Sequence, residues 1–209
     1  MADIDDVEKM LNDTARGIAV LIAQRSYALW NGKEFRKLVS FESISQTEQD
    51  RIFNELEVTG LGFLQFHLQE RAVSTGDESQ SKFYEELGER VPVQFVENLR
   101  ELGVSRKHVS LWRKLIKMRF QEYAEDLKLS YLGSARWKEL QGKNTWFKSI
   151  WARIETLAID SLHHIRRGKT DPHDPLWKVL RKWLAELEKD LTLLFRKLDE
   201  ERPHLQVKH

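Results

Sequence analysis

The chain has no cysteine and little proline or glycine: its 209 residues include no Cys, four Pro and ten Gly. Without thiols, the protein cannot form disulfides, use a cysteine nucleophile or hold a cysteine-ligated zinc or iron–sulfur centre. Because turn-forming residues are scarce, long helices are favoured over an all-β fold with many short connections. The composition therefore favours a helical fold and excludes thiol-based chemistry.

An excess of charge and a long apolar run are also missing. The chain carries 34 basic and 33 acidic residues, for a formal net charge of +1, so no global charge attracts nucleic acid or membrane. The longest aliphatic run, 18–23, is too short to span a bilayer, and the acidic N-terminal residues do not form a secretory leader. We expect a cytoplasmic protein without membrane association, and no motif indicates a cofactor.

Apolar residues recur at helical spacing along most of the chain, and no segment alternates with the period of a strand. Hydrophobic residues make up 41% of the sequence, which is enough for a core. We predict an all-α bundle of about five to seven helices in a single domain, 1–209, with the surface loop 74–80 as the candidate boundary between two halves. The long predicted helices cover residues 5–30, 46–73, 82–102, 106–132, 146–167 and 175–202. Two short segments, 33–40 and 135–141, are further candidate helices.

Several helix ends are marked by local signals. Ser45 and Glu48 have the spacing of a capping box and predict a helix start. Gly103 and Gly168 follow helical segments and predict left-handed C-caps. Asp174 precedes a proline, which is typical of an N-cap followed by the first helical residue.

The predicted helix 46–73 has a long uncharged stretch, VTGLGFLQFHLQ, at residues 58–69. A helix that is apolar on nearly every side is normally surrounded by other helices. Gly60 and Gly62 would let a neighbour approach closely. We therefore predict that this helix lies at the centre of the bundle.

A polar group is predicted inside the bundle. Arg25 lies in the apolar stripe of the first helix, and His67 and Glu70 lie near the end of the central one. Because a buried charge needs a partner, we predict that Arg25 pairs with Glu70, or with Glu57 as second choice. This group indicates either a structural ion pair with a core histidine, or a pocket for a small ligand or metal. An open pocket reaching His67 would favour the second interpretation, and Glu188 is expected on the surface.

A second polar group, on helix 146–167, could ligate a metal. Asp160 and His163 have the i, i+3 spacing that di-iron bundles use on two of their helices, and His164 is adjacent. However, His163 projects opposite the apolar stripe, and no E-x-x-H motif occurs in the chain. The alternative is that both histidines are exposed and complement the helix dipole.

The segment 94–114 resembles the turn and second helix of a helix-turn-helix DNA-binding motif. The matching residues are Leu102, Gly103, Val104, Ser105, Val109, Ser110 and Trp112. By that resemblance, the residues facing the DNA groove would be Arg106, Lys107 and His108. Those facing phosphates would be Arg113 and Lys114, with Lys117 on the same basic side.

This match covers about a tenth of the chain and departs from the motif in two ways. Asn98 and Leu99 stand where the motif usually has a core apolar residue and then a small one, and the second helix is much longer than a recognition helix. The alternative is that Gly103 and Ser105 are helix caps and the basic residues form a solvated face.

The sequence as a whole indicates a non-catalytic helical regulatory or adaptor protein that acts through protein–protein contacts. Self-association through Trp177 and Trp183 on the last helix would be one such contact, since tryptophan is common in interface hot spots. The alternative for Trp183, which lies on the main apolar stripe, is a place in the core, while Trp177 flanks that stripe. A DNA-binding regulator using segment 94–114 is the first alternative. The second alternative is a ligand- or metal-binding bundle, even an enzyme, with its pocket at His67 and Glu70.

Overall fold

A computed structural model describes residues 4–133, 145–171 and 173–201. Within these residues the chain forms seven α-helices, one short 3-10 helix and no strand, which confirms the predicted all-α bundle. The short predicted helix 135–141 lies outside the described residues. The elements are α1 (Ile4–Trp30), α2 (Lys33–Leu38), η1 (Phe41–Ser43), α3 (Gln46–Ser74), α4 (Glu78–Glu101), α5 (Arg106–Gly133), α7 (Thr145–Ile165) and α8 (Pro175–Glu201).

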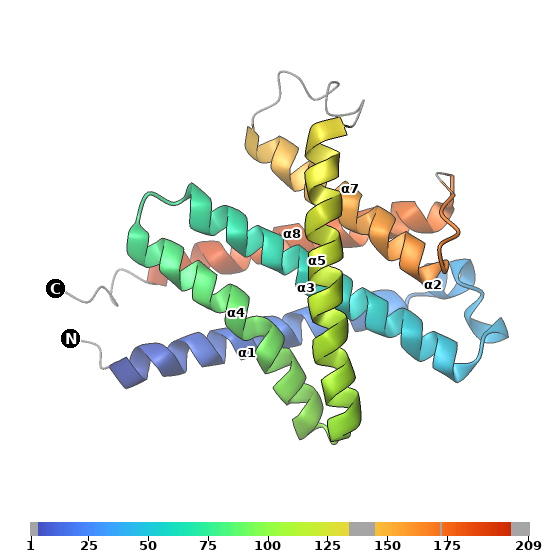
Figure 1. Ribbon diagram of the computed structural model, residues 1–209, viewed down its shortest axis with the longest axis horizontal. Helices are drawn as coiled ribbons and strands as arrows, with labels where there is room; N and C mark the ends of the chain where they lie inside the picture. Colours follow the sequence, from blue (N-terminus) through green and yellow to red (C-terminus); the bar gives the residue numbers. More distant parts are fainter. Residues whose placement is uncertain (1–3, 134–144, 172, 202–209) are drawn as a thin grey trace.

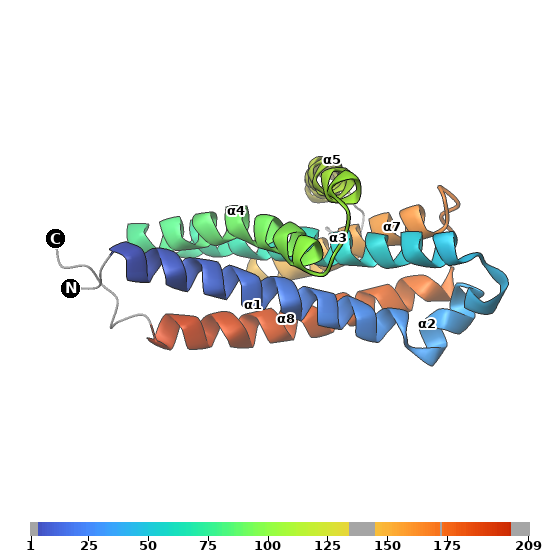
Figure 2. The ribbon, with the colours of Figure 1, turned by 90° about the horizontal axis from the view of Figure 1, so that it is seen from below.

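The helices are arranged in two layers with one helix lying across them (Figure 1). Figure 2 shows α1 and α8 on one side and α3, α4 and α7 on the other, with α5 outside the second layer. Helix α1 packs on α4 and α3, and α7 packs on α8, so the core fills the space between the layers. Helix α5 contacts α3, α4 and α7 with one face, which leaves its opposite face to solvent.

Helix α3 is the central helix, as its uncharged stretch predicts. It packs against α1, α4, α5, α7 and α8, and every residue of 55–64 is buried. A Cβ added at Gly60 would lie 2.8 Å from Ile22 of α1, and one at Gly62 would lie 2.6 Å from the Tyr123 ring of α5. The two glycines therefore allow α1 and α5 to approach α3 on different sides.

The helix caps predicted from local sequence are also confirmed. The amide of Glu48 donates to Ser45 Oγ at the start of α3, and the amide of Leu176 donates to Asp174 at the start of α8. Gly103 and Gly168 have φ of 88° and 82°, the left-handed conformation expected of C-caps. Helix α4 begins four residues earlier than predicted because the carboxylate of Asp77 accepts hydrogen bonds from two backbone amides and caps it.

Of the two roles that the sequence left open for Trp183, the structure supports the place in the core. Its side chain is only 6% exposed and lies in the core, next to Gly60 of α3. Trp177 is half-buried and packs against the same core, with the Arg181 guanidinium 4.8 Å from its ring centre. The indole of Trp183 therefore serves packing. None of the helices in the described residues is long and apolar enough to span a membrane.

Candidate functional site

The buried polar group predicted around His67 exists, but with different partners. His67 is 4% exposed, and its Nδ1 lies 3.1 Å from Glu188 of α8. The same carboxylate accepts from Arg153 of α7 at 3.3 Å, and Arg153 also pairs with Glu70. One buried guanidinium therefore joins α3, α7 and α8 through two carboxylates.

Two predictions about this group are wrong. Arg25 does not pair with Glu70 or Glu57; it pairs with Asp190 of α8 at 2.6 Å, and its side chain is 44% exposed. It lies where α1 meets α8 at the surface, so its long stem can pack while its charge stays near water. Glu188 is buried rather than on the surface, because it lies between Leu184 and Leu191 on the inner face of α8.

The pairing within the group explains its protonation states. Burial lowers the pKa of His67 and outweighs the opposing effect of Glu188. Burial alone would raise the pKa of Glu188, but contacts with His67 and Arg153 together hold it below its ordinary value. We therefore assign a neutral His67 that donates Nδ1–H to an ionised Glu188, with Arg153 supplying the compensating charge.

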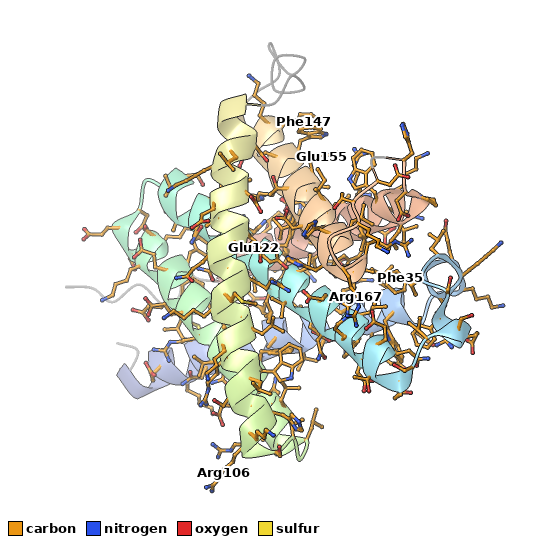
Figure 3. The ribbon with its side chains drawn as sticks, turned by 45° about the vertical axis from the view of Figure 1, so that its right-hand side comes forward. Phe35, Arg106, Glu122, Phe147, Glu155 and Arg167 are labelled. Atoms are coloured by element: carbon orange, nitrogen blue, oxygen red, sulfur yellow. The ribbon has the colours of Figure 1, made fainter. Side chains whose placement is uncertain are left out.

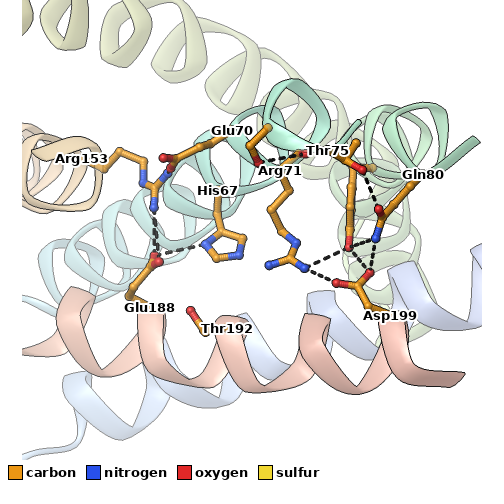
Figure 4. Close-up of a pocket in the computed structure, with 11 residues that line it drawn as sticks. His67, Glu70, Arg71, Thr75, Gln80, Arg153, Glu188, Thr192 and Asp199 are labelled. Carbon is orange, nitrogen blue, oxygen red and sulfur yellow. Dashed lines mark hydrogen bonds and ion pairs between the residues drawn. The ribbon is translucent and has the colours of Figure 1, made fainter. Parts of the chain in front are cut away.

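The group continues into a small open pocket of about 290 Å³. At the far end, Asp199 pairs with Arg71 and accepts from Tyr84 and Gln80, so a second guanidinium–carboxylate pair ties α3 and α4 to α8. Figure 4 shows His67 between the two arginines. His67 Nε2 is buried and has no hydrogen-bond partner among the described residues. His67 thus lines the pocket with a buried ring, while both guanidinium groups of the pocket are already paired.

The residues predicted to ligate a metal do not form a ligand set. Asp160, His163 and His164 line one cleft of about 550 Å³ between α5 and α7. His163 is exposed, as predicted, and hydrogen-bonds Thr170, whereas the Nε2 atom of His164 lies 3.1 Å from Glu122. No group of three or more His, Asp or Glu residues in the described parts of the chain is placed to hold a metal ion.

Asp160 is instead part of an acidic pair. Burial, followed by the negative charges of Asp126 and Glu122 and a hydrogen bond with Asp126, raises the pKa of Asp160 to about 8. At neutral pH this carboxyl is therefore mostly protonated. A protonated Asp160 relieves the repulsion between α5 and α7, which is a structural role that needs no ligand.

The basic residues of the helix-turn-helix-like segment lie on the solvent side of α5. The exposed residues are Arg106, Lys107, His108, Arg113, Lys114 and Lys117. Figure 3 shows Arg106 projecting from the end of α5 that follows α4. Arg113 pairs with Glu97 of α4 at 3.2 Å, which offsets its charge. Contact of this face with DNA stays a prediction.

A third cavity, which the sequence did not predict, is a groove between α1, α3, α4 and α5. Its volume is about 690 Å³, larger than that of the other two. Tyr27 and Phe53 form one aromatic pair on its wall, with ring centres 6.5 Å apart, and Phe95 and Trp112 form another at 5.2 Å. The full lining comprises Arg16, Ala19, Val20, Ala23, Gln24, Tyr27, Phe53, Glu57, Phe95, Asn98, Leu99, Glu101, Leu102 and Trp112. We call this cavity the aromatic groove.

The aromatic groove contains one buried acid. Glu57 of α3 is 2% exposed, and its Oε2 atom has no hydrogen-bond partner among the described residues. Burial raises the pKa of the Glu57 carboxyl to about 8. Burying an unpaired carboxylate is so unfavourable that the group takes up a proton instead. A carboxyl with a raised pKa in an aromatic cleft is a recognised mark of a functional site.

The sequence contains a weak signal for this site. Glu57 directly precedes the uncharged run of α3, and it lies on the same helical face as Phe53 and Gly60. This position should have indicated a buried acid facing a neighbouring helix. The other walls were not predictable, because Tyr27, Phe95 and Trp112 come from three further helices that only the tertiary fold brings together.

Comparison of the chain with the profiles of known protein families gives no match, and neither the curated proteins nor the solved structures contain a similar one.

Proposed function

We propose that this is a non-catalytic binding protein that takes a small, largely apolar organic molecule into the aromatic groove. The observation that carries the proposal is the groove itself. Its volume of about 690 Å³ falls in the range of sites for drug-sized ligands, which are mostly apolar with few polar groups. The proposal agrees with the non-catalytic, regulatory role inferred from the sequence, but its partner is a small molecule instead of a protein.

The surface around the groove supports this assignment. Val20 and Tyr27 are large exposed apolar side chains on α1, and Leu102, just after α4, is 82% exposed. All three line the groove, so apolar surface gathers at one cavity rather than being scattered. An apolar ligand would cover this surface and remove it from water, which is the main driving force for such binding.

A neutral fluorescent probe, N-phenyl-1-naphthylamine, tests the proposal because its emission rises in an apolar environment. We expect saturable binding to the protein. Ala23→Trp, which places an indole in the groove, should weaken it by at least about tenfold. Ala28→Trp on the exposed side of α1 is the matched control and should leave binding unchanged. Equal binding by both variants would place the probe elsewhere.

Light scattering at the same concentrations completes the test. A second copy of the chain covering the groove would appear as a dimer that excludes the probe. That result would favour the self-association inferred from the sequence and would contradict the small-molecule proposal.

The pocket at His67 supports a second candidate, a site for a small polar molecule with a hydrogen-bond donor. With Nδ1–H directed to Glu188, the unpartnered Nε2 of His67 is left as an acceptor beside the pocket. NMR spectra of the His67 ring, recorded with and without small alcohols and amines, would test this. A ligand that hydrogen-bonds to Nε2 should shift the ring signals of His67. Unchanged His67 signals throughout such a panel would leave the polar group with a structural role alone.

A further inference from the structure

Among the described residues, the buried part of the aromatic groove contains an acid and no base. Arg16 of α1 and Glu101 of α4 also line the groove, but they pair with each other, and their side chains are 52% and 56% exposed. The exposed pair is in contact with water and close to neutral overall. Glu57 is therefore the one buried ionisable group of the groove lining, and no lining cation is free to pair with it.

The walls beside Glu57 also favour positive charge. Tyr27, Phe53, Phe95 and Trp112 present aromatic rings from four helices. The face of an aromatic ring attracts a cation, most strongly in a site shielded from water. A carboxylate with aromatic rings around it can stabilise an organic cation that is too apolar to be strongly hydrated.

We infer that the ligand of the aromatic groove is a lipophilic organic cation, an amine or quaternary ammonium with an aromatic or branched apolar body, whose charge pairs with Glu57. This inference rests on the proposed function, since it names the ligand class of the same groove. The apolar body contacts the aromatic walls, and the cationic head replaces the proton that Glu57 holds in the empty groove.

Proton release gives the binding a defined pH dependence. The titratable or charged groups of the lining are Glu57 on α3, Arg16 and Tyr27 on α1 and Glu101 on α4, while α5 contributes only Trp112. Since the pKa of Glu57 is raised to about 8, a quaternary ammonium must displace a proton at lower pH. Its affinity should rise by about tenfold per pH unit up to about pH 8 and then level off.

A matched pair of probes tests the inference. One is (1-naphthylmethyl)trimethylammonium, and the other is its uncharged isostere, 1-neopentylnaphthalene, in which carbon replaces the nitrogen. Calorimetry or fluorescence titration at about pH 8.5 should give at least about tenfold tighter binding of the cation. Glu57→Gln should abolish this preference while keeping affinity for the isostere. Glu101→Gln at the exposed edge is the matched control and should keep the preference.

The outcomes separate the two proposals. Equal binding of the two probes, or binding of the isostere alone, would overturn the cation inference and leave the apolar groove as a ligand site. Binding of neither probe would overturn the proposed function itself. A preference that survives in Glu57→Gln would assign the charge recognition to another residue. The pH profile of the unmodified protein is an independent measurement, because a flat profile contradicts proton displacement even if the variant fails to fold.

Discussion

Replacing Glu57 by glutamine should change how the stability of the protein depends on pH. Glutamine has nearly the same shape as a protonated glutamate but cannot ionise. In the folded protein the pKa of Glu57 is raised from 4.5 to about 8, so the folded state holds a proton that the unfolded chain has already released. The resulting stability is present below about pH 4.5 and is lost as the pH rises towards 8.

The size of this effect follows from the shift. Each pH unit between the unfolded and folded pKa values of Glu57 costs about 1.4 kcal/mol of unfolding free energy. Between about pH 5 and pH 8 the loss from this one group is on the order of 4 kcal/mol. That is a large part of the 5–15 kcal/mol that typically holds a domain together, so it should be measurable.

Urea unfolding, followed by tryptophan fluorescence at several pH values and constant ionic strength, provides the assay. Asp160 has a pKa of about 8 and titrates in the same window, so the relevant quantity is the difference between wild type and Glu57→Gln at each pH. The variant should gain stability relative to wild type as the pH rises, by about 4 kcal/mol between pH 5 and 8. Two parallel curves would refute the assignment of a buried, protonated Glu57.

Two further substitutions test the packing around α3. Glu188→Ala removes one of the two carboxylates paired with the buried Arg153 and leaves His67 Nδ1–H without its acceptor, so it should cost about 1–3 kcal/mol in urea unfolding. Glu186→Ala at an exposed site should cost less than about 0.5 kcal/mol. A similar cost for both would mean that Glu188 is solvated. Gly62→Ala would place a methyl group 2.6 Å from the Tyr123 ring and should cost about 1–3 kcal/mol, while Gly76→Ala in open space should not lower the melting temperature. An unchanged melting temperature for both glycine variants would contradict the close approach of α3 and α5.

The parts of the fold that the sequence predicted are those decided locally. Ser45, Gly103 and Asp174 act on the backbone within a few residues, so their patterns indicate helix ends without knowledge of the tertiary structure. The uncharged stretch of α3 likewise predicts its central place, since each side of it must contact another helix.

The pairing of charges between helices was not predicted, because it depends on which helices are neighbours. Arg25 pairs with Asp190 because α8 lies beside α1, a fact that no local pattern contains. Glu70 pairs with Arg153 of α7 and not with Arg25. The burial of Glu188 was within reach of the sequence, since it lies four residues after Leu184 on the inner stripe of α8.

The central claim, that the aromatic groove holds a lipophilic cation against Glu57, is tested most directly by a crystal structure of the protein with (1-naphthylmethyl)trimethylammonium. We predict electron density for the naphthyl ring among Tyr27, Phe53, Phe95 and Trp112, with the quaternary nitrogen within about 5 Å of the Glu57 carboxylate, as expected for a close charge pair. Density for the probe outside the groove, or an empty groove at saturating concentration, would contradict the claim.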